Sequence, residues 1–112
     1  MMSPSDPIIV LMSAGSSEEG AAIADMLVGT NLAACVQILP QMKSVYRWKG
    51  KIEREVEVLL IAKTLSSKFD ELERRVRAIH SYDTPEIVAI PAASVSTPYR
   101  EWLVDSLAAS GK

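Results

Sequence analysis

The pattern of apolar and polar positions predicts that strands and helices alternate along the chain. The first element is Ile8–Met12, a wholly apolar, β-prone run typical of a strand that is buried on both faces. Ser16, followed three residues later by Glu19, forms a capping-box signature and predicts the start of a helix. The apolar positions of that helix fall on one face and include Ile23, Met26 and Leu27.

A long β-hairpin is predicted next. Its first strand begins at Leu32, is interrupted at Pro40 and resumes over Ser44–Trp48, and its second strand runs from Lys51 to about Thr64. Lys49-Gly50 fits a two-residue turn, because glycine adopts positive φ without a steric penalty. The first half of the second strand alternates and places three glutamates on one face, namely Glu53, Glu55 and Glu57.

Two more helices and a last strand complete the pattern. Ser66 or Ser67 is expected to cap a helix whose inner face carries Phe69, Leu72, Val76 and Ile79. Glu86–Ile90 is the last clear strand. Thr97 as N-cap and Pro98 at the first helical position predict a third helix, with its inward residues at Tyr99, Trp102, Leu103 and Leu107.

This β-α-β-β-α-β order with a terminal helix predicts an α+β, ferredoxin-like fold. No repeat, low-complexity tract or linker interrupts the chain, so residues 1–112 are interpreted as one domain.

The predicted hairpin is too long for an isolated copy of that fold. Its arms of roughly twelve to sixteen residues exceed the usual five or six. The overhanging part carries apolar side chains that a monomer would expose to water: Val45, Tyr46, Trp48, Ile52 and Val56. Exposed apolar edge strands pair readily with other chains, so we expect an obligate homo-oligomer in which the hairpin joins neighbouring sheets.

Composition and charge narrow the function. The net charge of −2 offers no attraction to phosphate backbones, so nucleic acid is not an expected partner. The one cysteine, Cys35, cannot form an intrachain disulfide. The amino-terminal region lacks a basic segment, and its apolar run is too short for a signal peptide or a membrane span, so we expect a cytoplasmic protein without membrane association.

Five separated motifs together resemble the CutA family of divalent-cation tolerance proteins. The motifs are Leu32–Val36, Ser44–Glu53, Lys63-Thr64, His80–Ile87 and Tyr99–Trp102, in order and at matching spacings over nearly the whole chain. The resemblance implies a ferredoxin-like fold and a tight homotrimer shaped like the PII signalling proteins. It also implies a role in tolerance to divalent metals, with copper as the expected ion.

His80, Asp83 and Cys35 are the candidate metal ligands. His80 lies at a predicted helix end, where an imidazole also serves as a structural cap. His80 and Asp83 would offer nitrogen and oxygen ligands, although His, Asp and Glu crowded in one loop match no standard metal motif. Cys35 fits either a buried small hydrophobe or a ligand for a soft ion such as Cu(I). Trimerisation would multiply these ligands and permit a site between subunits.

A second group of residues is the candidate lining of a ligand cleft. Glu57 and Lys63 lie on one face of a strand that becomes apolar, where burial would force ionisable groups to pair or to shift their pKa. Two interpretations of Glu57 and Lys63 therefore stand: they form an intersubunit salt bridge, or they line a polar cleft together with Tyr82, His80 and Glu86. Trp48 is interpreted as an interface anchor or as part of that cleft.

Four functions are compared on these residues. A metal-responsive trimer without turnover and a PII-like sensor of small molecules in intersubunit clefts both fit. Acylphosphatase-like catalysis would need an arginine in the loop at residues 13–17, which has no basic residue, and no nucleophile–base pair is evident elsewhere, so we expect no enzyme. RNA binding would need aromatic residues on the strands Ile8–Met12 and Glu86–Ile90, which carry none.

Overall fold

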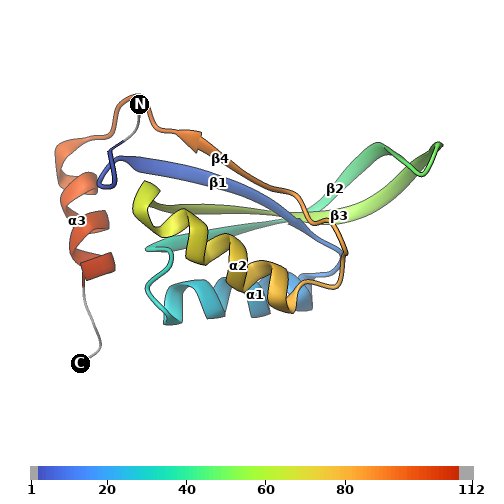
Figure 1. Cartoon of the computed structure of the whole chain (residues 1–112), viewed down its shortest axis with the longest axis horizontal. Helices are drawn as coiled ribbons and strands as arrows, with labels where there is room; N and C mark the ends of the chain where they lie inside the picture. Colours follow the sequence, from blue (N-terminus) through green and yellow to red (C-terminus); the bar gives the residue numbers. More distant parts are fainter. Residues whose placement is uncertain (1–2, 109–112) are drawn as a thin grey trace.

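The protein folds as a four-stranded antiparallel sheet with two helices across one face (Figure 1). The structure is a computed structural model that describes residues 3–108. The strands β1 (Pro7–Ala14), β2 (Cys35–Trp48), β3 (Lys51–Leu65) and β4 (Ile87–Pro91) lie in the order β2-β3-β1-β4. The helices are α1 (Ser17–Gly29), α2 (Phe69–Ile79) and α3 (Thr97–Ala108), and a 3-10 turn at Ser66–Lys68 precedes α2. The element order expected from the sequence and the mixed α+β class are confirmed.

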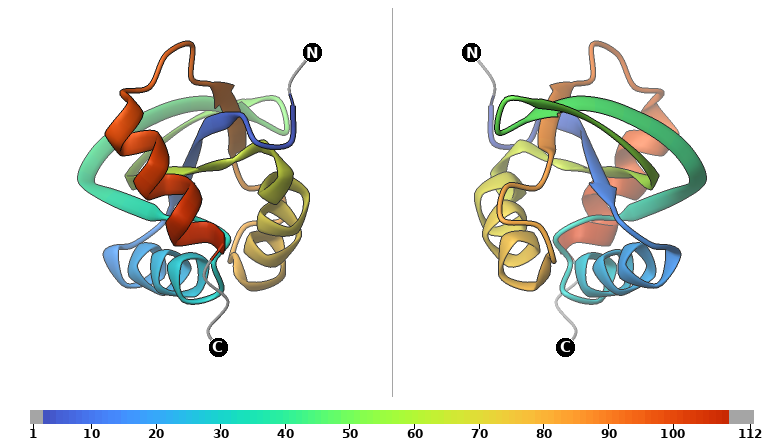
Figure 2. Two further views of the ribbon diagram at one scale, coloured as in Figure 1. Left: turned by 90° about the vertical axis from the view of Figure 1, so that its left-hand side faces the viewer. Right: turned by 90° about the vertical axis from the view of Figure 1, so that its right-hand side faces the viewer.

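The core lies between the sheet and the helices α1 and α2, which lie side by side (Figure 2). Alternate residues of β1 are fully buried toward the helices, namely Ile8, Val10, Met12 and Ala14. Ile9 and Leu11 point to the opposite face and are only half-buried. The apolar run of β1 was expected to be buried on both faces, but within the described chain only α3 packs against one end of that side, so β1 is fully buried only on the side of α1 and α2.

The start of α1 partly follows the expected capping box. The Ser16 hydroxyl accepts a hydrogen bond from the Glu19 amide at 3.1 Å. The Glu19 carboxylate, however, accepts from the amide of Gly15, one residue before the cap, at 3.3 Å. The Glu19 carboxylate also accepts hydrogen bonds from Ser81 in the loop after α2, so this one side chain connects that loop to the start of α1.

The start of α2 differs from the prediction. Neither Ser66 nor Ser67 caps the helix, because the chain first forms a 3-10 turn and the N-cap position falls on Lys68, which makes no side-chain cap bond. The Ser66 hydroxyl instead donates to the carbonyl of Ser3. Leu72 and Val76 are fully buried as expected, whereas Ile79 in the last turn is 50% exposed and belongs to neither core cluster.

The β2–β3 hairpin extends well beyond the rest of the sheet (Figure 1). Pairing between β3 and β1 stops at Val58, so residues 51–57 pair with β2 alone. The predicted turn is confirmed, with φ of 51° at Lys49 and 81° at Gly50. The expected break at Pro40 is a register shift between Leu39 and Met42 within one continuous strand, where Gln41 has a φ of 59°.

The helix α3 packs at the end of the molecule opposite the hairpin tip (Figure 1). Leu103 and Leu107 are buried with Leu65 of β3, as predicted. The expectation that Tyr99 and Trp102 point inward is wrong for the single chain, because Trp102 is 46% exposed and Tyr99 is also exposed. Their rings contact each other, with centroids 5.4 Å apart, beside the uncovered face of the sheet.

Candidate functional site

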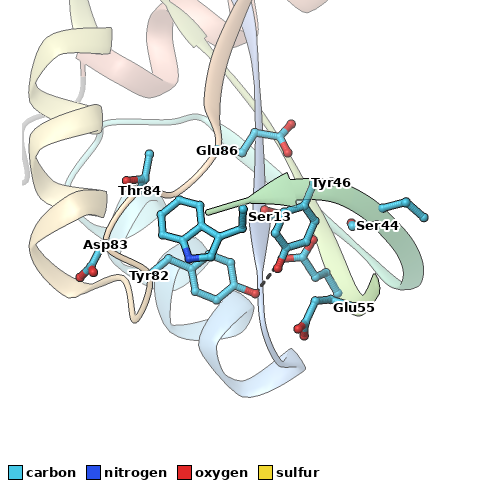
Figure 3. Close-up of a pocket in the computed structure, with 11 residues that line it drawn as sticks. Ser13, Ser44, Tyr46, Glu55, Tyr82, Asp83, Thr84 and Glu86 are labelled. Atoms are coloured by element: carbon cyan, nitrogen blue, oxygen red, sulfur yellow. Dashed lines mark hydrogen bonds between the residues drawn. The ribbon is translucent and has the colours of Figure 1, made fainter. Parts of the chain in front are cut away.

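A cavity of about 630 Å³ lies between the hairpin and the loop that joins α2 to β4 (Figure 3). We call it the hairpin cavity. The hairpin contributes Ser44, Val45, Tyr46, Trp48, Glu55 and Glu57, the loop contributes Tyr82, Asp83, Thr84 and Glu86, and β1 contributes Ser13. The lining therefore combines aromatic rings with carboxylates and contains no basic side chain.

The alternation of side chains along each strand explains which hairpin residues line this cavity. Ser44, Tyr46 and Trp48 are spaced two residues apart on β2, so their side chains share one face. Glu55 lies directly across from Ser44 in the antiparallel register, and Glu57 lies across from Met42. The same period-two pattern therefore puts aromatic rings and carboxylates on the concave side of the hairpin.

A hydrogen bond from Tyr82 to Glu57 closes the base of the hairpin cavity. The Tyr82 hydroxyl donates to Oε2 of Glu57 at 2.7 Å, and Glu57 is only 6% exposed. Burial, followed by the hydrogen bond to the Glu57 carboxylate, raises the pKa of the Tyr82 hydroxyl well above its ordinary value. Tyr82 therefore remains a proton donor at neutral pH and holds the loop against β3.

His80 lies beneath this loop and uses both ring nitrogens. Its side chain is 0% exposed. The Tyr82 amide donates to Nδ1 at 3.1 Å, so Nδ1 is an acceptor and the ring proton lies on Nε2, which donates to the Ser13 carbonyl at 2.7 Å. The backbone amide of His80 caps α2 by donating to the Val76 carbonyl at 2.9 Å. A metal ion at either nitrogen would have to replace one of these hydrogen bonds.

Glu19 fixes the same loop from the other side. Its Oε2 accepts from the Ser81 amide at 2.7 Å, and its Oε1 accepts from the Ser81 hydroxyl at 3.0 Å. Partial burial opposes ionisation of Glu19, but the hydrogen bonds from Ser81 and from the Gly15 amide outweigh it and lower the pKa of the carboxyl. The loop is thus held by a carboxylate on α1 and by Glu57 on β3.

A second cavity, of about 480 Å³, lies between α3 and the uncovered face of the sheet. We call it the α3 cavity. Its lining includes Cys35, Gln37 and Lys63 from the hairpin strands, together with Tyr99 and Trp102 from α3. Cys35 and Lys63 are paired across β2 and β3, and the Lys63 ammonium donates to the Gln37 side-chain carbonyl. The thiol of Cys35 is partly accessible and belongs to neither buried core cluster.

No preformed metal centre occurs in the described part of one chain. Within residues 3–108, His, Cys, Asp and Glu side chains do not gather in any group of three or more that would hold a metal ion. Also within this part, no helix is both long and apolar enough to cross a membrane.

Comparison with known proteins identifies the family. The model of the CutA1 divalent ion tolerance protein family matches residues 8–106. The chain belongs to the CutA1 family. The divalent-cation tolerance protein CutA of Thermus thermophilus is 44% identical over 95 residues, which cover 85% of this chain and 92% of that protein. The periplasmic divalent cation tolerance protein CutA of Archaeoglobus fulgidus superposes with a TM-score of 0.88 at 40% identity, over 90% of this chain and 98% of that one.

The family also includes longer proteins. The chloroplastic protein CutA 1 of rice is 41% identical over 99 residues, and the matched region covers 88% of this chain but 56% of the rice protein. The chain therefore spans about half the length of that relative.

In this CutA1-family chain, the predicted cleft residues divide between the two cavities. Glu57, Tyr82, Glu86 and Trp48 all line the hairpin cavity, and so does the predicted metal ligand Asp83. Lys63 and Cys35 line the α3 cavity instead, because Lys63 lies six positions beyond Glu57 along β3. His80 lines neither. Asp83, Cys35 and His80 are thus not brought together within one chain, and their role as metal ligands stays a prediction.

Several site residues were not selected from the sequence. Glu19 and Ser81 hold the loop, and Ser13, Ser44 and Glu55 line the hairpin cavity. The alternation of Glu53, Glu55 and Glu57 in the sequence already placed Glu55 on the same strand face as Glu57, which was selected. The partnership of Glu19 with Ser81 had no sequence signal, because 62 positions separate the two residues.

Proposed function

We propose that this protein acts in divalent-cation tolerance as a homotrimer with a ferredoxin-like fold and that it binds a divalent metal, copper foremost, between its subunits. Membership of the CutA1 family is the observation that carries this proposal. Its relatives in Thermus thermophilus and Archaeoglobus fulgidus are named divalent-cation tolerance proteins. The strand order β2-β3-β1-β4 is compatible with the ferredoxin-like arrangement.

Exposed apolar surface supports self-association. The outer face of the hairpin presents Ile52 and Val56 to solvent, and Val45, which also borders the hairpin cavity, is 64% exposed. The uncovered sheet face adds exposed Val88 and Ile90 on β4, together with exposed Leu39 on β2. Monomeric proteins rarely leave apolar patches of this extent uncovered, and β2 and β4 are edge strands able to pair with another chain.

A metal site between subunits would explain how a member of a divalent ion tolerance family binds metal although the described part of one chain contains no metal cluster. Cys35 and Asp83 remain partly or fully accessible, so a symmetric assembly is able to bring copies of either residue together. The thiolate suits a soft ion such as copper, and the carboxylate suits harder divalent ions. We therefore propose Cys35 as the first ligand to test, with Asp83 second.

Metal titration of the assembled protein tests the proposal. Light scattering should give three chains per particle at sub-micromolar protein, and calorimetry should show binding of Cu²⁺ or Cu(I). Cys35→Ala should weaken copper binding by at least about tenfold, while Glu101→Gln on the exposed face of α3 leaves it unchanged. A stable folded monomer, or copper affinity that survives both Cys35→Ala and Asp83→Asn, would contradict it.

A second candidate function is non-catalytic binding of a small molecule, as in PII-like sensors. The size of the hairpin cavity favours it, because about 630 Å³ is typical of small-molecule sites. Neither serine of the lining donates its hydroxyl to a base within the described residues, so we propose binding without turnover. We propose a cytoplasmic location for this chain, although relatives carry chloroplastic and periplasmic designations.

A further inference from the structure

The hairpin cavity concentrates negative charge. Four carboxylates line it, from Glu55, Glu57, Asp83 and Glu86. Within residues 3–108 none of them forms an ion pair, and the lining contributes no lysine, arginine or histidine to balance them. A concave site lined by one sign of charge attracts ligands of the opposite sign.

Glu57 contributes a nearly buried carboxylate to the lining of this cavity. Glu57 is only 6% exposed, and its Oε2 accepts a hydrogen bond from the Tyr82 hydroxyl. Oε1 makes no hydrogen bond with the described residues. In that part of the chain no fully buried side-chain oxygen or nitrogen lacks a partner, so Oε1 is not fully buried. Water satisfies Oε1 while the cavity is open, and a cation or hydrogen-bond donor that displaces this water would take over the position.

Aromatic rings line the same cavity. Tyr46 comes from β2 and Tyr82 comes from the opposite loop (Figure 3). Trp48, also on β2, completes the set, and the Lys49 ammonium lies 5.7 Å from the centroid of its ring. Aromatic faces attract cations through the quadrupole of the ring, most strongly in tryptophan, and they also supply apolar contact. Rings combined with carboxylates thus suit a ligand that is both positively charged and partly apolar.

The spacing of the carboxylates distinguishes an organic cation from a bare metal ion. A metal needs several ligand atoms within about 2.0–2.6 Å of one point. The acids around the hairpin cavity do not converge in this way, since among residues 3–108 no group of three His, Cys, Asp or Glu side chains forms a metal cluster. Dispersed carboxylates around a cavity of about 630 Å³ match the larger volume and spread charge of an organic cation.

We infer that the hairpin cavity binds an organic cation, of the quaternary ammonium or guanidinium class, between Trp48, Tyr46 and the open oxygen of Glu57. This inference rests on the second candidate function, small-molecule binding, and names the class of ligand. The aromatic rings contact the apolar groups around the charge, Glu57 contacts the charge, and Glu55, Asp83 and Glu86 attract the cation to the entrance.

Choline and 3,3-dimethyl-1-butanol provide a direct test, because they have the same shape and differ in charge. Trp102→Phe leaves Trp48 as the only tryptophan, so its fluorescence reports on the cavity. Choline should bind at least about tenfold more tightly than the neutral alcohol, and its affinity should fall as salt is added. Equal affinities for the two compounds would overturn the inference.

Matched variants locate the binding. Glu57→Gln preserves the shape and an acceptor for Tyr82, and it should weaken choline binding by about tenfold. Glu53→Gln removes a carboxylate from the same strand face outside the lining and should change affinity less than about twofold. An affinity unchanged by Glu57→Gln would contradict the site.

A neighbouring subunit is the alternative source of a cation. The outer face of the hairpin carries Arg47 and Arg54, which alternate with the inward residues. If the wild-type protein binds no choline but a variant with both Arg47→Gln and Arg54→Gln does, a neighbour's guanidinium fills the cavity and the inference is wrong. Binding to the wild-type protein and no gain in the double variant support it.

Parallel titrations separate this inference from the proposed functions. If 3,3-dimethylbutanoate or the neutral alcohol binds as tightly as choline, the small-molecule function stands and the inference fails. If none of the three binds, both fail. Copper binding and particle mass measured on the same sample report on the metal-tolerance proposal independently of the choline result.

Discussion

The Tyr82 hydroxyl donates a 2.7 Å hydrogen bond to Glu57 Oε2 and thereby joins the loop after α2 to the middle of β3. The acceptor lies at the point where β3 leaves the body of the sheet, because Glu57 precedes Val58, the last β3 residue paired with β1. This bond therefore sets the position of the loop relative to the base of the overhanging hairpin.

Removing this hydroxyl should destabilise the fold. Tyr82→Phe keeps the ring but leaves Oε2 of Glu57 without its donor, and we expect a loss of about 1–2 kcal/mol in the free energy of unfolding. Urea unfolding at one fixed protein concentration measures it, since stability of an oligomer depends on concentration. Tyr99→Phe is the matched control and should change stability by less than about 0.5 kcal/mol, because Tyr99 is exposed. Equal effects would contradict the role of the bond.

The same tyrosine should make stability fall at alkaline pH. Burial and the hydrogen bond to Glu57 raise the folded-state pKa of Tyr82 above its ordinary value of 10.0. A raised folded-state pKa gives stability that is fully present below pH 10 and is lost as the pH rises through the folded-state value. Unfolding measured from pH 8 upward should show this loss in the wild-type protein and a smaller loss in Tyr82→Phe. Parallel curves for the two proteins would refute the assignment.

Glu19 should produce the opposite dependence at acid pH. Its folded-state pKa is lowered by hydrogen bonds from Ser81 and Gly15, so its contribution is present above the ordinary value of 4.5 and is lost as the pH falls through the folded-state value. Glu19→Gln should cost about 1–2 kcal/mol at pH 7 and should lose less stability than the wild-type protein between pH 5 and pH 3. Glu18→Gln, on the exposed neighbour, should keep the wild-type acid profile.

Two glycines of α1 should respond oppositely to alanine. A Cβ at Gly20 would lie 3.1 Å from Val58 Cγ2 and 3.3 Å from Leu60 Cδ2, so Gly20→Ala would overpack the core and cost about 1 kcal/mol or more despite better helix propensity. A Cβ at Gly29 would meet nothing within 4 Å, and Gly29→Ala should stabilise the protein by about 0.4–1 kcal/mol. Thermal unfolding of both variants distinguishes the signs, and a stabilising Gly20→Ala would contradict the packing described.

His80 should behave as a structural residue in unfolding experiments. His80→Ala removes a buried ring and its hydrogen bonds with the Ser13 carbonyl and the Tyr82 amide, so we expect a loss of about 2–4 kcal/mol with or without a chelator present. Measurement of urea midpoints with and without a chelator checks it. A loss that appears only when metal is available would instead make His80 a ligand.

Local pattern was sufficient for much of this fold. The apolar run at Ile8–Met12, the spacing of Leu72 and Val76 and the Lys49-Gly50 turn predicted β1, α2 and the hairpin, because side-chain period and turn chemistry act within a few residues. The same local reasoning placed Ile79, Tyr99 and Trp102 inward, and the structure leaves them exposed. Periodicity identifies which side chains share a face and cannot say how far the opposing layer extends.

The candidate site shows the same division. The sequence by itself selected Glu57, Tyr82, Asp83, Glu86 and Trp48, from ionisable and aromatic residues on the long strands and the loop before β4. Only the tertiary structure decided that these five line one cavity while Cys35 and Lys63 line another, since the register of β3 against β1 separates the two ends of one strand face. It also decided that His80 bonds with Ser13 and that Glu19 reaches Ser81. Those contacts join residues more than sixty positions apart, and chain folding alone brings them within hydrogen-bond distance.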